Sequence, residues 1–268
     1  HHRRGGSGEA RGVRLRRPSV TTGLSYPKWA LAPMALALTL LGLPLVGLLV
    51  RADWARLPEL LMSERSLDAL RLSLYTCLIS TLFVLILGVP TALVLARTRG
   101  RWASAARTLV TVPMVLPPVV AGLALLTTLG RRGLVGQHLS ALGIEIGFTT
   151  TAVVIAQTFV ALPFLVVSLE GALRSSGQDY ERAATYLGAS PTRTLLTVTL
   201  PMAAPALASG TALSFARALG EFGATLTFAG SLQGTTRTLP LEIYLLRESD
   251  SDLALALSVV LLAVAGVV

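Results

Sequence analysis

The sequence predicts an all-α integral membrane protein with about six transmembrane helices. Only 14% of the 268 residues are charged, whereas 53% are hydrophobic, and the mean hydropathy is +0.68. Soluble domains carry about 25% charged residues, so this composition indicates a protein of the lipid bilayer. Six segments approach the roughly 20 apolar residues that a spanning helix needs: 29–50, 72–96, 108–129, 149–169, 203–229 and 253–268.

The first, second and last of these segments are uncharged apolar runs. The first, 29–50, is too long for a signal peptide, so we expect it to remain as a membrane anchor. The second, 72–96, holds Cys77, the only cysteine, which we expect to be a small buried side chain. The last, 253–268, is short for a span.

Prolines occur within the third and fourth segments. Pro113, Pro117 and Pro118 lie in the third, and Pro163 lies in the fourth. Proline removes a backbone donor and kinks a helix, and neighbouring helices can satisfy the freed carbonyls. We therefore expect both segments to be interrupted. We interpret the Pro117-Pro118 pair as lying near a gate, and Pro163 as a packing kink.

The fifth segment, 203–229, contains two charged residues. Charges within a span cost a few kcal/mol each and face the protein interior or a watery cavity. Arg217 and Glu221 are four residues apart, so on a helix they are neighbours and can pair. The same face carries a stripe of small and polar residues, Thr211, Ser214, Ala218, Glu221 and Thr225. The stripe either lines a transport pathway, or it packs against other helices with Arg217 and Glu221 as a structural ion pair.

Basic residues are concentrated in alternate loops. With a cytoplasmic N-terminus, the inner segments 1–28, 97–107 and 170–200 carry a net charge of +10 and the outer loops −1. Positive loops stay on the cytoplasmic side, where they can also contact anionic membrane lipid. Orientation accounts for the positive excess, so we expect no nucleic-acid partner. Residues 1–28 show no apolar period, and we expect them to be disordered.

The sequence lacks the residues for an energy source of its own. A nucleotide-binding P-loop needs a lysine after its glycines, and the only lysine, Lys28, lies in YPKWA. His138, the only histidine beyond the first two residues, lies in an outer loop, which disfavours Ser/His/Asp catalysis. No Cys/His spacing indicates a metal site. We expect no enzyme activity and no cofactor, with any ATP hydrolysis in a separate subunit.

Residues 181–201, ERAATYLGASPTRTLLTVTLP, are too polar to span a bilayer. The stretch Asp179–Leu187 has no helix breaker and ends at Gly188, a residue type that stops helices. Ser190-Pro191 then has the pattern of an N-cap followed by proline at the first helical position. We expect two short helices joined by a glycine turn, which could equally be an amphipathic connector without a partner.

This segment resembles the EAA loop of ABC importer permeases, a cytoplasmic element that inserts into a cleft of the ATP-hydrolysing subunit. The family pattern is E-A-A-x3-G-x9-I-x-L-P, and residues 183–201 have its spacing. Arg182 occupies the position of the family's glutamate, and an acid appears one residue earlier, at Glu181. The resemblance implies an ATPase-coupling loop between the fourth and fifth spans. Its residues are Glu181, Arg182, Ala183, Ala184, Gly188, Ala189 and Ser190.

The chain also resembles the molybdate branch of these permeases and, to a lesser extent, the sulfate permeases. The matching stretches are VPMVLPPVVAG at 112–122, AQTFVALPFLV at 156–166, ALGEFGATLTFAG at 218–230 and TRTLPLEIY at 236–244. The resemblance implies a permease subunit for an oxyanion, most simply molybdate, with tungstate, sulfate and thiosulfate as alternatives. An ATPase-independent transporter or channel is a further alternative.

The resemblance implies an architecture and partners. Residues 29–268 would form the transmembrane domain in the cell's inner membrane, after the basic N-terminal segment 1–28. Two copies of the chain would surround one pathway, with two ATP-binding cassette ATPase subunits beneath and an extracytoplasmic substrate-binding protein above. The candidate pathway residues are Pro117, Pro118, Thr211, Ser214, Arg217 and Glu221.

Overall fold

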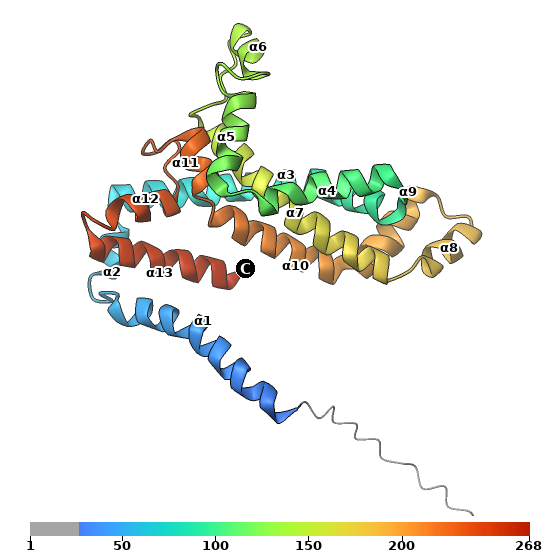
Figure 1. Ribbon diagram of the computed structural model, residues 1–268, viewed down its shortest axis with the longest axis horizontal. Coiled ribbons are helices and arrows are strands. Elements are labelled where there is room, and N and C mark those ends of the chain that lie inside the picture. The colour runs from blue at the N-terminus through green and yellow to red at the C-terminus, as the bar shows by residue number, and fades with distance from the viewer. Residues whose placement is uncertain (1–26) are drawn as a thin grey trace, which may run out of the picture. The chain divides into compact units, whose positions relative to one another are not determined.

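The computed structural model describes residues 27–268, and these are helices joined by loops, with no strand among them (Figure 1). The prediction that residues 1–28 are disordered concerns residues outside the described range, apart from Pro27 and Lys28. The helical elements are η1 Lys28–Ala30, α1 Leu31–Arg51, α2 Leu57–Leu61, α3 Glu64–Arg97, α4 Arg101–Val115, α5 Pro118–Leu129, α6 Gly136–Ala141, α7 Thr150–Ser175, α8 Asp179–Tyr186, α9 Pro191–Thr194, η2 Leu195–Thr199, α10 Leu200–Leu219, α11 Gly223–Ala229, α12 Leu239–Leu246 and α13 Ser251–Val267.

Four helical stretches are long and apolar enough to cross a membrane: Lys28–Arg51, Glu64–Arg97, Thr150–Ser175 and Pro191–Leu219. The bent pair α4 and α5 makes a fifth if it is one span, and α13 is apolar but shorter. The structure therefore confirms an all-α, multi-pass membrane protein, while the predicted number of six spans is not reached by length alone. Residues up to Val46 and from Gly47 onward form separate units.

Helix α7 is the central element of the unit that begins at Gly47. Its sequence is apolar on all sides, which is typical of a helix surrounded by others. It packs against α3, α4, α10 and α11, and 56% of its most apolar stretch is buried, compared with 28% in α3. Polar contacts fix its register, because Ser80 of α3 donates to the Gln157 side chain over 3.0 Å.

The third predicted span is two helices. The chain bends by 116° between α4 and α5, and the break lies at Leu116 and Pro117, whose backbones are extended. Each precedes a proline, and proline pushes the residue before it out of the helical region. The expectation that Pro113 and Pro163 also interrupt their spans is wrong, since both lie inside continuous helices. In α7 the surrounding helices hold the proline-containing turn in place.

The fifth predicted span, 203–229, is also not a single helix. Helix α10 ends at Leu219, and α11 starts only at Gly223. At its other end, α10 continues without a break from the preceding α9 through η2, so the helical stretch is Pro191–Leu219. Segment η2 is a turn of the wider π type, a feature that is frequent at functional sites.

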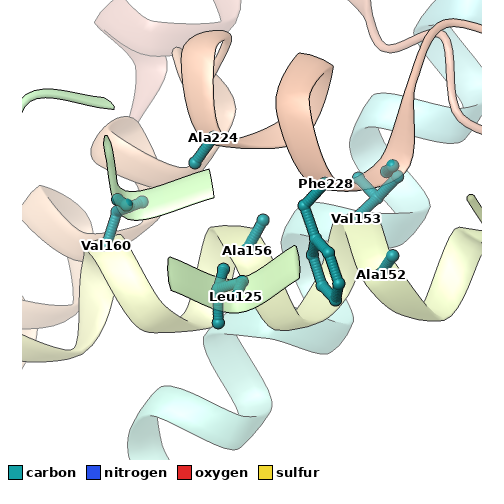
Figure 2. Packing of buried hydrophobic residues seen from close by; sticks show 9 residues of the cluster. Leu125, Ala152, Val153, Ala156, Val160, Ala224 and Phe228 are labelled. Atoms are coloured by element: carbon teal, nitrogen blue, oxygen red, sulfur yellow. The ribbon is translucent and has the colours of Figure 1, made fainter. Parts of the chain in front are cut away.

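Helices α5, α7 and α11 enclose a compact apolar cluster. Phe228 of α11 lies beside Leu125 of α5 and Ala156 of α7 (Figure 2). Small residues let the backbones approach, as in many membrane proteins. A Cβ atom on Gly122 of α5 would lie only 2.7 Å from Cβ of Thr227 and 2.8 Å from the carbonyl oxygen of Ala224. Helices α5 and α11, each of which follows a break in its predicted span, are therefore in close backbone contact.

Candidate functional site

The polar segment after α7 folds as a two-helix elbow, defined here as residues 178–194. Helix α8 ends at Tyr186 with Leu187 as its C-cap, and the next residue, Gly188, has φ of +83°. The Gly188 amide donates to the Thr185 carbonyl and the Ala189 amide to the Ala184 carbonyl, each over 3.0 Å. These two bonds form a Schellman motif, in which glycine is favoured because it alone adopts positive φ without strain. The predicted glycine stop is confirmed.

The second arm of the elbow begins where the sequence predicts. The Ser190 side chain accepts a hydrogen bond from the Arg193 amide over 3.3 Å, and Pro191 is the first helical residue. This N-cap satisfies a backbone donor that the first helical turn leaves free. Because α9 runs on through η2 into α10, the elbow is directly connected to a long apolar helix.

The outer surface of the elbow is available for contact. Arg182 and Ala183 are exposed, and Ala184 and Ala189 are partly buried. Tyr186 and Leu187 are each 89% exposed, although an apolar side chain is normally kept from water. The predicted coupling residues therefore lie together in one exposed elbow.

Glu181 differs from the rest of the elbow because its carboxylate is directed back toward the chain. Its Oε1 atom pairs with the Arg97 guanidinium at the end of α3 and accepts a hydrogen bond from the Thr199 hydroxyl over 2.6 Å. Sequence reasoning missed both partners, which lie 84 and 18 residues away in the chain. The only sequence signal was the acid itself, one position away from its place in the family pattern.

A second ion-pair network lies close to the end of α3. Arg107 of α4 donates to Glu170 of α7 over 2.5 Å and to the carbonyl oxygens of Leu95 and Thr98. The latter bonds satisfy acceptors that the C-terminus of a helix leaves free. Arg174 reaches the same Glu170 carboxylate over 3.3 Å. Sequence reasoning treated these residues only as loop charges, and their network joins α3, α4 and α7.

A polar cavity of about 450 Å³ opens between the elbow and the ends of α3 and α7. Its lining includes four arginines and one glutamate: Arg97, Arg99, Arg174, Arg182 and Glu181. The cavity leaves one side of the Arg97–Glu181 pair unpacked. This pair is therefore reachable by solvent, in contrast to the pair described next.

Arg217 and Glu221 form the predicted ion pair, with 2.7 Å between Nη1 and Oε2. The pair does not lie on one helix, because Glu221 lies in the break after α10. Its Oε1 atom accepts a hydrogen bond from the Ala224 amide over 2.7 Å, so one carboxylate both pairs with arginine and caps α11. Burial of Glu221 is nearly complete, with 1% of its side chain exposed compared with 28% for Arg217.

The other stripe residues face the interior of the chain. The Ser214 hydroxyl donates to the Ala161 carbonyl of α7 over 3.0 Å, and Ala218 is fully buried. Thr211 is partly buried, and its hydroxyl bonds its own helix at the Leu207 carbonyl. The Ser214 bond joins α10 to α7 within one chain. Whether any stripe residue also lines a pathway stays a prediction.

The structure brings the two helix breaks together. Gly223, next to the break that holds Glu221, lies against Pro118, since a Cβ atom on Gly223 would come within 2.7 Å of Cβ of Pro118. The predicted pathway residue Pro118, which follows Pro117, is thus a neighbour of the segment that carries Glu221. In many transporters discontinuous helices of this kind form the substrate site near the middle of the membrane.

Comparison with known proteins provides the remaining findings. Residues 88–268 match the family described as "Binding-protein-dependent transport system inner membrane component". The chain is 54% identical to the molybdenum transport system permease protein ModB of Mycobacterium tuberculosis, over 90% of this chain and 92% of that protein. It is 33% identical to the sulfate transport system permease protein CysT of Escherichia coli, over 82% of this chain and 79% of that protein.

A solved structure has the same fold. One chain of a bacterial alginate ABC transporter, in complex with a periplasmic protein that holds an alginate pentasaccharide, superposes with a TM-score of 0.69. The superposition covers 89% of this chain and 91% of that one, at 20% identity. At this identity the likeness establishes the fold and leaves the substrate open.

Proposed function

Since the chain belongs to the family of binding-protein-dependent transport system inner membrane components, we propose that it is the permease subunit of an ATP-driven importer of molybdate. The observation that supports molybdate as the substrate is the 54% identity to a molybdenum permease over nearly the full length of both proteins. Sulfate import is the second candidate, and the lower identity of 33% to a sulfate permease ranks it behind molybdate. Tungstate, a similar tetrahedral dianion, remains an alternative substrate.

The elbow is the docking element for a separate ATPase. Its exposed surface at Arg182, Ala183, Tyr186 and Leu187 supports this role, as does the spacing of the residues 183–201. Two ATPase subunits would serve two copies of this chain, and a binding protein would deliver the anion from outside. In this arrangement the N-terminus and the elbow lie in the cytoplasm, where positively charged loops remain.

The pathway must be polar and alternately open, because an unpaired charge is prohibitively costly in hydrocarbon. The two adjoining helix breaks, at Pro117-Pro118 and at Glu221, offer polar groups and interrupted backbone within the apolar segments. Arg217 retains more access than Glu221, so its guanidinium is the group best placed to attract an anion. ATP binding would close the ATPase pair, move the elbows and turn the pathway outward.

Substrate choice is tested by uptake in cells that lack their own molybdate system. Cells expressing this chain with its neighbouring subunits should accumulate molybdate. A tenfold excess of sulfate should leave that uptake nearly unchanged, because binding sites can discriminate between similar substrates by more than about tenfold. Uptake that sulfate abolishes would instead identify a sulfate permease.

Coupling is tested by Gly188→Pro. Proline cannot adopt the φ of +83° found at Gly188 and cannot donate to Thr185, so the elbow should distort and ATP-driven uptake should be lost. Gly143→Pro is the matched control, because Gly143 has φ of +80° and donates to Ser140 in the same way, but lies outside the elbow. Intact uptake in Gly188→Pro, with no ATPase subunit recovered on gentle purification, would favour an ATPase-independent transporter or channel.

A further inference from the structure

Helix α8 is attached to the rest of the chain by very few contacts. None of its residues is buried. Within residues 27–268, Glu181 is the only residue of α8 whose side chain hydrogen-bonds or ion-pairs outside the helix. Both flanking turns contain glycines with positive φ, Gly177 at +70° and Gly188 at +83°. The position of α8 therefore depends on a single side chain to an unusual degree.

That side chain contacts two separate parts of the membrane domain. The Arg97 guanidinium donates to Glu181 and also lies 3.4 Å from the Thr199 hydroxyl. The Thr199 hydroxyl in turn donates to Glu181 over 2.6 Å. Thr199 is only 3% exposed and is the last residue of the π turn that precedes α10. The three side chains form a closed cluster between α3, α8 and the start of α10.

The end of α3 is itself firmly held, which makes Arg97 a fixed point. Arg107 bonds the carbonyl oxygens of Leu95 and Thr98 on either side of Arg97, and it also bonds Glu170 of α7. Helix α3 then packs along α7. A displacement of α8 that keeps the Arg97 contact must therefore move, or be resisted by, the α3–α7 core.

We propose that Glu181 is the positioning residue that fastens the coupling helix α8 to α3 and α10, and that it does not grip the ATPase. This inference rests on the proposed function of the elbow. Force from the ATPase enters the membrane domain at two points, along the chain through α9 and η2, and across the Arg97–Glu181–Thr199 cluster. Arg182, which stands where the family pattern has the acid, is exposed and makes no ion pair within residues 27–268, so it is left to meet the partner.

The strength of the cluster suits a moving element. The side chains of Arg97 and Glu181 are 45% and 19% exposed, and a cavity of about 450 Å³ lies beside them. Pairs in contact with solvent are weakened by screening, so this one can open and re-form during a transport cycle. The charge-assisted hydrogen bond from Thr199 makes the closed state more specific than a simple surface pair.

The first test measures the attachment directly by hydrogen exchange of the full chain in lipid nanodiscs. Glu181→Ala and Arg97→Ala should each speed the exchange of the α8 amides by about tenfold, the equivalent of about 1.4 kcal/mol. Arg182→Ala is the matched control and should leave that exchange unchanged, because in residues 27–268 its side chain makes no ion pair. Unaltered exchange in Glu181→Ala would overturn the proposal.

The second test measures coupling in proteoliposomes that contain the complete importer. Glu181→Ala and Arg97→Ala should bind the ATPase subunit normally but transport at least about fivefold less molybdate per ATP, the lower range of allosteric coupling. Arg97→Glu combined with Glu181→Arg should recover transport, whereas a merely structural loss would not be rescued. Arg99→Ala is the control for removing an arginine from this surface.

The outcomes separate this inference from the proposed function. If Glu181→Ala loses the ATPase subunit while Arg97→Ala keeps it, Glu181 grips the ATPase and the inference is wrong. If the unmodified importer fails to transport molybdate, the proposed substrate is wrong, and the hydrogen-exchange result still decides whether Glu181 holds α8.

Discussion

Two arginine–glutamate pairs in this chain use the same chemistry differently. Arg97–Glu181 joins segments 84 residues apart and is partly open to solvent. Arg217–Glu221 spans four residues, and its carboxylate is almost completely buried. Removing one partner of a buried pair leaves an uncompensated charge, whereas an exposed pair opens at little cost. The comparison assigns the buried Glu221 carboxylate to holding the fold and the open Arg97–Glu181 pair to a part that moves.

The largest expected effect is at the buried pair. Glu221→Ala leaves Arg217 uncompensated and the Ala224 amide without its acceptor, so the free energy of unfolding should fall by about 3–5 kcal/mol. Thermal unfolding and the fraction of monodisperse protein in detergent measure this loss. The double variant Arg217→Ala with Glu221→Ala should be more stable than Glu221→Ala alone.

A matched control for this prediction is Glu248→Ala, which removes a carboxylate paired with Arg247 on the surface and should leave the unfolding temperature unchanged. Arg217→Ala tests the other half of the pair. If this variant keeps its assembly and ATPase binding but depresses uptake, Arg217 serves the anion pathway as proposed; if assembly collapses, Arg217 is needed for the fold.

The next largest effect is expected at the close contact between α5 and α11. Gly122→Ala places a methyl group 2.7 Å from Thr227 and 2.8 Å from the Ala224 carbonyl, and such overpacking costs about 1–3 kcal/mol. Gly171→Ala is the matched control in α7, where a Cβ atom meets nothing within 4 Å, so it should stabilise the helix by roughly 1 kcal/mol. Equal melting temperatures for the two variants would contradict the close contact.

The smallest effect belongs to the elbow. Ser190→Ala removes the N-cap of α9 and should cost about 1 kcal/mol locally. Because the elbow is exposed, this loss should appear as faster hydrogen exchange at Arg193, with little change in the melting temperature of the whole chain. Ser190→Asp keeps an N-cap oxygen and should restore the slow exchange. A global loss of stability would show that the elbow is part of the core.

The elbow was predictable from sequence because its determinants are local. Gly188 stops one helix and Ser190-Pro191 starts the next, whatever surrounds them. The partners of Glu181 were not predictable in the same way. Arg97 lies on a different helix, and only the packing of α3 beside the elbow brings the two charges together.

The helix breaks show the same limit. Pro117-Pro118 breaks its segment and Pro163 does not, since two consecutive residues at the break each precede a proline and α7 is enclosed by other helices. The spacing of Arg217 and Glu221 fitted one continuous helix, and the pair indeed forms. The break at Gly220 went unnoticed although glycines flank Glu221 and Phe222 in GEFG. The predicted number of six spans stays a prediction, because hydropathy does not register a bend and α13 is apolar but short.

The most direct test of the whole account is ATP-dependent uptake of molybdate by vesicles that contain this chain, its ATPase and its binding protein. Accumulation that requires ATP and that Gly188→Pro abolishes, while Gly143→Pro preserves it, is the predicted result. Uptake that proceeds equally without ATP, or that survives distortion of the elbow, would contradict the claim that the elbow couples ATP hydrolysis to transport.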